Sequence, residues 1–415
     1  MAGSELANRS AQSGAAPANP FIIGQHATGE GFTDRVAEID RFVDALSDSS
    51  TRLVVYGDRR LGKSSALNVA AERVRAAGRP VAVVDLGKAN SAIAAAQRIV
   101  GAIYKEIGAP WEQLAKGIVA RLRGAVTVTA SVEPAGTSSF ALKLEPGSGA
   151  AEAESRLVTE VLDAVEEELA RRNHRIGLVL DEFQRLLAWG GEDVEWALKA
   201  SFETHRHTAY IMAGSARRLI EDMVSKKRRA LWGVVEAMEF GPIEDALMMR
   251  WIVDRSAATG VPIDVIVAAT IVRLAGPRTR DIVQLARAVW FLSRDRGAAT
   301  RSDVTEAMES LVDEQSPLHL RVWDARTATE RRVLTVLAAE PEVSLLAAET
   351  LGKYDLGPKS TIQNAVSALV GDEILTRTER SGGFTYDDPF FRRWVEVNAL
   401  EDINRTPPPL LPDEV

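Results

Sequence analysis

The sequence contains no cysteine among its 415 residues. Disulfide bonds, thiolate zinc sites and a cysteine nucleophile are therefore excluded, so any chemistry must use oxygen and nitrogen groups with a hard cation. Long hydrophobic runs are also absent, since no stretch approaches the roughly 18 consecutive apolar residues of a membrane span. The segment from Met1 to Pro20 lacks the apolar core and basic flank of a signal peptide. We therefore expect a cytoplasmic protein without membrane association.

An excess of positive charge is missing as well. The 50 Lys and Arg residues are outnumbered by 58 Asp and Glu residues, which gives a formal net charge of -8. This balance argues against nucleic-acid binding by bulk electrostatics and leaves room only for a local basic patch. Hydrophobic residues at 46% and charged residues at 26% are ordinary values for globular proteins, and the length allows two or three domains.

The clearest motif runs from Gly57 to Ser64 and matches the pattern GxxxxGK[ST]. It follows the apolar run 53–56 and precedes the helix-forming run 65–72. A strand that ends in a glycine loop and opens a helix directs backbone N–H groups and the positive end of the helix dipole at one point, where polyphosphate binds well. The expected nucleotide-binding residues are Gly57, Asp58, Arg59, Arg60, Leu61, Gly62, Lys63, Ser64 and Ser65.

Two side chains of this loop have predicted roles. Lys63 can reach the β- and γ-phosphates, and the Ser64 hydroxyl can ligate the Mg²⁺ that bridges them. A nucleotide base also needs apolar surface, which the segment before a phosphate loop commonly supplies. We therefore predict Phe21, Ile23 and Phe32 as base contacts.

A second motif is the apolar run 176–180 followed by Asp181 and Glu182. Two carboxylates at the end of a buried strand are costly unless something neutralises them, and Mg²⁺ would do so. Beside a phosphate loop, Asp181 would hold the ion, usually through a water, and Glu182 would act as general base for the attacking water. The alternative is a strand end followed by a helix cap.

A further buried strand, 209–213, leads to Ser215, which is placed to sense the γ-phosphate or to orient water. Arg217, Arg218 and the basic run 226–229 follow it. A cationic residue near the nucleotide could act as an arginine finger, whereas the alternative is that these residues are solvated helix ends.

The remaining patterns of the first half predict the surroundings of these motifs. The spacing of apolar residues predicts helices at 64–77, 91–107 and 152–172 and a buried strand at 81–86. Alternation with a period of two predicts a β-hairpin insertion near 125–145. The hairpin could dock subunits or nucleic acid, or could serve as a protective flap.

The second half begins with consecutive apolar-faced helices between residues 243 and 314. Three further helices and two short strands then predict a winged helix, with its second and third helices at 344–351 and 359–370. The third helix offers groove-contacting side chains from Lys359 to Asn364, but the unit also carries many acidic residues. This domain could therefore bind double-stranded DNA weakly or dock a protein.

The order of these motifs resembles that of the archaeal-type ATPase family, part of the STAND group of NTPases related to AAA+ and origin-recognition ATPases. The segments that carry the resemblance are 32–39, 54–65, 178–184, 211–215, 231–243 and 387–394. The resemblance implies an α/β fold of the P-loop NTPase type. Its parallel five-stranded sheet would have the catalytic strand between the phosphate-loop strand and its neighbour, and a helical lid and a C-terminal winged helix would follow.

The resemblance also implies a lid arginine. Gly276 and Pro277 look like the break that precedes the lid helix, and Arg278 or Arg280 would then close over the nucleotide. The family pattern usually separates the glycine from the proline by one residue, so the choice between the two arginines stays open. The expected segments are a disordered tail at 1–19, an ATPase core at 20–243, a helical lid at 244–320, a winged helix at 321–400 and a disordered tail at 401–415.

These observations predict a Mg²⁺-dependent ATPase that works as a nucleotide-driven conformational switch and hydrolyses ATP slowly, because no finger in cis is unambiguous. ATP is favoured over GTP because no guanine-reading Asn-Lys-x-Asp motif is present. A homo-oligomer could supply an arginine from a neighbour. One alternative is an ATP-controlled DNA-binding regulator or remodeller, and another is a nucleotide-holding scaffold without useful hydrolysis.

Overall fold

The computed structural model describes residues 18–24, 34–107, 126–132, 138–144, 150–378 and 382–411. These residues form two compact units. The described residues from Asp34 to Ile243 make up one, here called the sheet unit. Residues 18–24 and those from Glu244 onward make up the other, the helical unit. Phe32, one of the predicted base contacts, lies outside the described residues.

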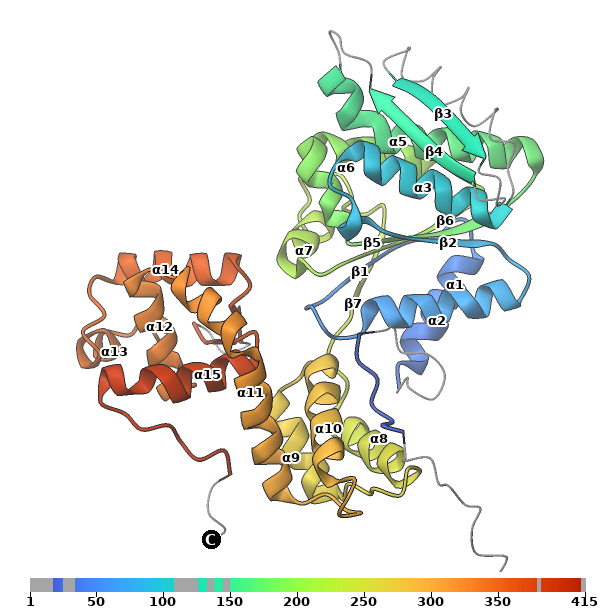
Figure 1. Ribbon diagram of the computed structural model, residues 1–415. Coiled ribbons are helices and arrows are strands. Elements are labelled where there is room, and N and C mark those ends of the chain that lie inside the picture. The colour runs from blue at the N-terminus through green and yellow to red at the C-terminus, as the bar shows by residue number, and fades with distance from the viewer. Residues whose placement is uncertain are drawn as a thin grey trace, which may run out of the picture. The chain divides into compact units, whose positions relative to one another are not determined.

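The sheet unit is built on five strands: β1 (Arg52–Tyr56), β2 (Val81–Asp85), β5 (Ile176–Asp181), β6 (Thr208–Gly214) and β7 (Glu236–Glu239). All neighbouring strands are parallel, in the order β2-β5-β6-β1-β7 (Figure 1). The expected parallel five-stranded sheet is therefore confirmed, but the expected place of the catalytic strand is wrong, because β5 lies between β2 and β6 and is not adjacent to the phosphate-loop strand β1. β6 lies between β1 and β5, so the carboxyl ends of these three strands meet at one edge of the sheet.

Helices cover both faces of this sheet. α1 (Val36–Ser47) and α2 (Lys63–Ala76) lie on one face, and α3 (Ala92–Ile107), α5 (Ala150–Arg172) and α6 (Leu187–Thr204) lie on the other (Figure 1). A parallel sheet buried on both faces explains why the central strands read as continuous apolar runs.

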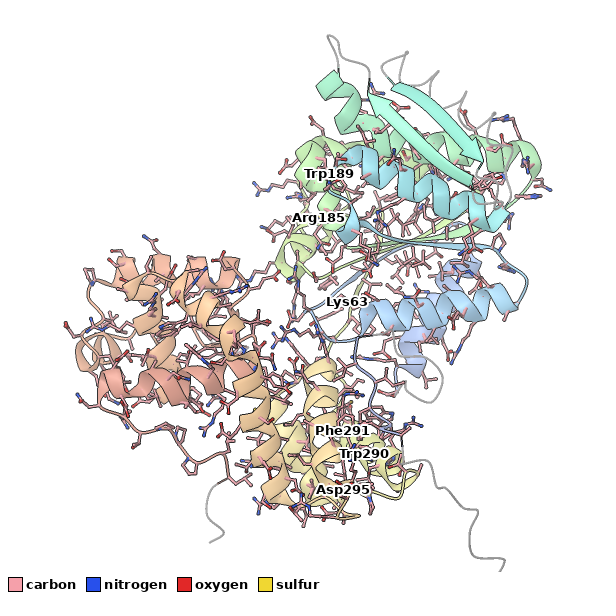
Figure 2. The ribbon with its side chains drawn as sticks, in the orientation of Figure 1. Lys63, Arg185, Trp189, Trp290, Phe291 and Asp295 are labelled. Atoms are coloured by element: carbon pink, nitrogen blue, oxygen red, sulfur yellow. The ribbon has the colours of Figure 1, made fainter. Side chains whose placement is uncertain are left out.

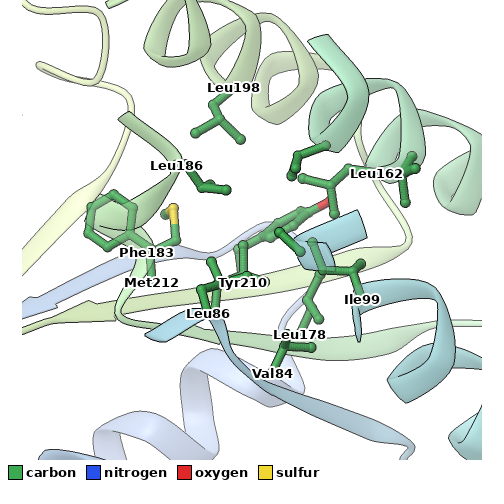
Figure 3. Packing of buried hydrophobic residues seen from close by; sticks show 14 of the residues in the cluster. Val84, Leu86, Ile99, Leu162, Leu178, Phe183, Leu186, Leu198, Tyr210 and Met212 are labelled. Carbon is green, nitrogen blue, oxygen red and sulfur yellow. The ribbon is translucent and has the colours of Figure 1, made fainter. Parts of the chain in front are cut away.

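The strands alternate their side chains between two apolar cores. Leu178 and Leu180 of β5 pack with α3, α5 and α6, whereas Val179 between them packs with α1 and α2. Figure 3 shows part of the first core, where Ile99, Leu162 and Leu198 of the three helices surround strand residues. This packing on both faces fixes the register of the sheet and thereby the positions of its strand ends.

The predicted hairpin is confirmed. β3 (Val126–Val132) and β4 (Ser138–Leu144) pair antiparallel, with Val126 opposite Leu144, and lie beside α3 (Figure 1). Shorter elements follow the carboxyl ends of β2, β5 and β6. They are the 3-10 helices η2 (Leu86–Lys88) and η3 (Phe183–Leu186) and the helix α7 (Arg217–Ser225).

The helical unit starts with the consecutive helices that the sequence predicts. These are α8 (Asp245–Ala257), α9 (Val265–Ala275), α10 (Thr279–Ser293) and α11 (Arg301–Asp324). Asp264 caps α9 by accepting hydrogen bonds from the N–H groups of Ile266 and Val267, which explains why that helix begins there.

A winged-helix arrangement follows. Its parts are α12 (Ala328–Ala339), α13 (Ala348–Lys353), α14 (Lys359–Gly371), β8 (Leu375–Arg377), β9 (Phe384–Tyr386) and α15 (Pro389–Ala399). Thr327 and Glu330 form a capping box at the start of α12. The hydroxyl of Tyr386 donates a buried hydrogen bond of 2.6 Å to the carbonyl of Leu334 and so ties the wing to α12.

The last described residues differ from the disordered tail expected from residue 401. Leu400–Ile403 form the 3-10 helix η4. Arg405 pairs with Glu340 at 3.1 Å, and Arg393 donates to the carbonyl of Pro408 at 2.9 Å. This stretch is therefore fixed to the helical unit. None of the helices in the described ranges is long and apolar enough to cross a membrane.

Candidate functional site

The loop between β1 and α2 has the backbone geometry that its glycines require. Gly62 has φ +96° and caps α2, a conformation that favours glycine. At Gly57 the reason is space, because a Cβ atom there would lie 2.2 Å from the carbonyl oxygen of Phe240. Both glycines are thus needed to bring the loop across the end of the sheet and into the helix.

Lys63 begins α2, as labelled in Figure 2, and its side chain turns back over the loop. Its ammonium group donates to the carbonyls of Gly57 and Asp58, each at 2.6 Å. Burial lowers the pKa of Lys63, and the charges of Glu182 and Asp181 act in the opposite direction. A buried cation therefore lies against the loop, with carboxylates close to it.

Ser64 and Asp181 meet, although 117 positions separate them in the sequence. The Ser64 hydroxyl donates to Oδ2 of Asp181 at 2.5 Å, and Oδ1 of Asp181 accepts from the N–H of Glu182 at 3.0 Å. Burial raises the pKa of Asp181, and the hydrogen bond from Ser64 counteracts this. A hydroxyl and a buried carboxylate side by side are hard oxygen donors of the kind that Mg²⁺ accepts, so the pair fits that ion.

The described residues contain no group of three His, Cys, Asp or Glu side chains that could hold a metal ion by themselves. At phosphate sites Mg²⁺ keeps several waters and binds one or two protein oxygens together with substrate phosphates, so Ser64 and Asp181 are the residues that would hold it.

Glu182 lies next to Ser215 and Gln184. Its Oε2 atom accepts a hydrogen bond from the Ser215 hydroxyl at 2.9 Å and another from the Gln184 amide at 2.5 Å. Nε of Arg59, in the phosphate loop, lies 3.4 Å from Oγ of Ser215. The structure therefore brings the phosphate loop, the carboxylate pair and the residue after β6 together at the carboxyl ends of β1, β5 and β6.

Gln184 is the member of this group to which sequence reasoning gave no role. The signal was weak, because an amide two residues after a carboxylate pair has no distinctive pattern. Its contact with Glu182 depends on the 3-10 turn η3, which begins directly after Glu182. Glu182 itself has a left-handed backbone conformation (φ 55°, ψ 39°).

The basic residues after β6 are divided among several partners. Arg217 pairs with Glu239 at 2.5 Å, and Lys226 pairs with Asp222 at 2.6 Å. Arg229 forms an ion pair with the buried Glu195 of α6. Lys227 and Arg228 are exposed. Within the sheet unit, Arg229 thus has a packing role. Arg217, Arg218 and Lys226 are exposed as well, so a role as arginine finger stays a prediction for these exposed cations.

Two of the predicted base contacts lie in the helical unit. Phe21 is fully buried there, and its ring meets that of Trp251 edge to face with centroids 5.5 Å apart. Arg287 donates to the carbonyl of Phe21 at 2.7 Å. Ile23 is half-buried. Phe21 is thus part of the core of the helical unit, and a role in base binding stays a prediction for both residues.

The two candidate lid arginines differ in environment. Arg278 precedes α10 and is buried, with 5% of its surface exposed. It donates to the carbonyl of Asp387 at 2.5 Å and forms an ion pair with the same residue's carboxylate. Arg280 is exposed. Within the helical unit, Arg278 therefore ties the start of α10 to the segment after the wing, and Arg280 is the more accessible of the two.

A match to a known family shows where this chain belongs. Residues 32–250, more than half of the chain, match the family described as an ATPase domain predominantly from Archaea. The chain belongs to this family. Residues 318–397 of the archaeal-type ATPase also match a probable winged helix domain. A search among curated proteins found no match.

Solved structures resemble this ATPase-family chain over most of its length. The Walker-type ATPase PABY2304 of Pyrococcus abyssi has 14% identity and a TM-score of 0.59, covering 91% of this chain and 100% of its own. The ORC2 protein of Aeropyrum pernix, in ADPNP-ADP complexes, has 14% identity and a TM-score of 0.57, covering 93% of this chain and 97% of its own. At this identity the likeness shows the fold, a P-loop NTPase with a winged helix.

Proposed function

We propose that the protein binds ATP together with Mg²⁺, hydrolyses it, and uses the nucleotide state to switch conformation. The observation that carries the proposal is the contact of Ser64 with Asp181 beside the contact of Ser215 with Glu182. The family supports nucleotide hydrolysis in general, and the adenine nucleotides in the ORC2 complexes support ATP over GTP.

Each side chain then has a task in the attack of water on the γ-phosphate. Lys63 exchanges its two carbonyl partners for phosphate oxygens, and the loop N–H groups hold the remaining charge. Mg²⁺, held by Ser64 and Asp181, would neutralise charge on the β- and γ-phosphate oxygens. Glu182 accepts a proton from the attacking water, and Ser215 senses whether the γ-phosphate is present.

The switch depends on the helical unit. In this proposal Arg278 or Arg280 responds to the nucleotide, and the exposure of Arg280 favours it for that contact. In this proposal hydrolysis is slow in isolated molecules, because none of the described basic residues after β6 is unambiguously a finger in cis and Arg229 is engaged by Glu195. A second copy of the chain could supply the missing cation.

The test is phosphate release by wild type, Lys63→Ala and Glu182→Gln at two protein concentrations, with and without double-stranded DNA. We expect ATP turnover by wild type and by neither variant, whereas Glu182→Gln should still bind ATP. A rate that rises with protein concentration supports self-assembly. ATP turnover by Glu182→Gln at the wild-type rate would refute the assigned chemistry. Many turnovers per second by the dilute monomer would refute the proposal that hydrolysis is slow.

A second candidate function is ATP-controlled binding of double-stranded DNA. One observation favours it: the polar side chains of α14 are all exposed, while Ile362, Ala365, Val366 and Leu369 are buried. The exposed polar residues in its first half are Lys359, Ser360, Thr361, Gln363 and Asn364. Replacing Lys359 and Gln363 with alanine should abolish retention on DNA if this helix enters a groove. If the domain docks a protein, these changes leave DNA retention as it was.

A further inference from the structure

The candidate general base Glu182 is held from two sides. Ser215 approaches it from the end of β6, and Gln184 approaches it from the turn that follows β5. We infer that Gln184 is a positioning residue for ATP hydrolysis, which aims the Glu182 carboxylate through a hydrogen bond. The inference rests on the proposed function, because it requires Glu182 to act on the attacking water.

The two hydrogen bonds fall on the same carboxylate oxygen. Oε2 of Glu182 accepts from Nε2 of Gln184 at 2.5 Å and from the Ser215 hydroxyl at 2.9 Å. Within the described part of the chain, Oε1 takes no hydrogen bond from a protein group and stays available for water. Two donors on one oxygen fix the carboxylate plane, so the second oxygen has a defined direction.

The backbone is adapted to this arrangement. Glu182 has φ 55°, in the left-handed region that non-glycine residues seldom adopt. This conformation lets the chain turn from β5 into η3, which returns Gln184 toward the carboxylate two residues earlier. Unusual backbone conformations of this kind cluster at functional sites because the surrounding structure must hold them.

The neighbouring strand makes room for Gln184. A Cβ atom at Gly214 would lie 2.1 Å from Oε1 of Gln184, so only glycine at the end of β6 allows this amide position. Oε1 of Gln184 is buried and receives no hydrogen bond from the described residues. A buried acceptor without a donor is costly. This orientation of the amide is still favoured, because the reverse orientation would place its oxygen against the carboxylate of Glu182.

The direction of the hydrogen bonds also connects the base to the phosphate loop. The hydroxyl of Ser215 has a single proton, which it gives to Glu182, so its oxygen can accept from Arg59 of the loop. A chain of donors thus runs from a cation in the loop to the carboxylate. Gln184 is the second anchor of that carboxylate, and its hydrogen bond to Glu182 does not involve the loop.

The experiment compares Gln184→Leu and Gln184→Glu with wild type. Leucine keeps the size of the side chain and removes the donor, and glutamate places a second negative charge against Glu182. We expect kcat to fall about 10- to 100-fold in the leucine variant and further in the glutamate variant. The dissociation constant for ATP and the midpoint of thermal unfolding should change little. Arg185→Ala is the matched control, because Arg185 is the next residue and is exposed (Figure 2).

The readouts separate positioning from a structural role and from failure of the proposed function. If Gln184 acts through Glu182, adding Gln184→Leu to Glu182→Gln lowers the residual rate no further. The inference is overturned if Gln184→Leu keeps the wild-type kcat while Glu182→Gln is inactive. It is equally overturned if Gln184→Leu weakens ATP binding and lowers the unfolding midpoint in step with kcat. Wild-type turnover in Glu182→Gln would instead overturn the proposed function itself.

Discussion

Arg52, at the start of β1, is the residue whose replacement should cost the sheet unit most. Its side chain is almost fully buried, and the guanidinium donates to five main-chain carbonyls, those of Ser49, Thr51, Phe202, His205 and Thr208, at 2.8–3.3 Å. It also lies 5.1 Å from the centre of the Tyr210 ring. One side chain therefore joins the start of β1 to the segment that leads from α6 into β6.

Arg52→Met keeps most of the aliphatic stem and removes all five hydrogen bonds. Two of the carbonyls keep another partner, since Thr51 accepts from the N–H of Tyr210 and His205 accepts from Arg206. The other three lose a charged donor in a buried setting. A buried acceptor that loses its donor costs about 1–3 kcal/mol, so with three such carbonyls we expect a total loss of about 3–5 kcal/mol.

The assay is urea unfolding followed by tryptophan fluorescence, with the transition of the sheet unit analysed separately because the chain has two units. The affinity for ATP under native conditions should be unchanged, since Arg52 lies at the opposite end of β1 from the phosphate loop. A loss below about 1 kcal/mol would refute this reasoning, because it would show that water replaces the guanidinium at little cost.

Three further predictions concern charge and contact. Burial raises the pKa of Glu166, but hydrogen bonds from the N–H groups of Arg206 and His207 and the Thr208 hydroxyl outweigh it, so the net pKa is lowered. Its stabilisation is complete above the unfolded value of about 4.3 and is lost as the pH falls through the folded value, so Glu166→Gln should destabilise by about 1–3 kcal/mol at pH 7 and by progressively less as the pH falls below about 4.3. A loss that does not decrease as the pH is lowered would contradict this. Arg278→Ala should lower the unfolding midpoint of the helical unit and Arg280→Ala should not, because only Arg278 is buried against Asp387; equal midpoints would disprove it. Tyr386→Phe should cost about 1 kcal/mol by calorimetry, since it removes one buried hydrogen bond, and no measurable change would show that the bond contributes nothing.

The parts of the fold that depend on local patterns could be predicted from the sequence. The phosphate loop is an example, because a strand, a glycine turn and a helix start are each encoded within a few residues. The hairpin of β3 and β4 is another example. Its alternating apolar pattern and the residues expected to form its turn lie within one short stretch of the sequence. The carboxylate pair at the end of β5 was recognisable because two charges after a buried run are unusual.

The contacts that could not be predicted depend on which strands become neighbours. The position of Gln184 follows from the left-handed turn at Glu182 and from the absence of a side chain at Gly214, on a different strand. The pair of Arg278 and Asp387 joins residues 109 positions apart, and no local pattern marks either as the partner of the other. Phe21 looked like part of the sheet unit because it precedes the phosphate loop, yet its ring packs on Trp251 in the helical unit.

We propose that Ser64, Asp181 and Glu182 form one site for Mg²⁺-dependent ATP hydrolysis. The most direct test is a single-turnover measurement of phosphate release from γ-labelled ATP by wild type and Glu182→Gln, each with Mg²⁺ or with excess EDTA, with bound ATP measured in parallel. We predict that wild type releases phosphate only when Mg²⁺ is present, and that Glu182→Gln with Mg²⁺ retains bound ATP. Release at the same rate by Glu182→Gln, or by wild type in EDTA, would contradict it.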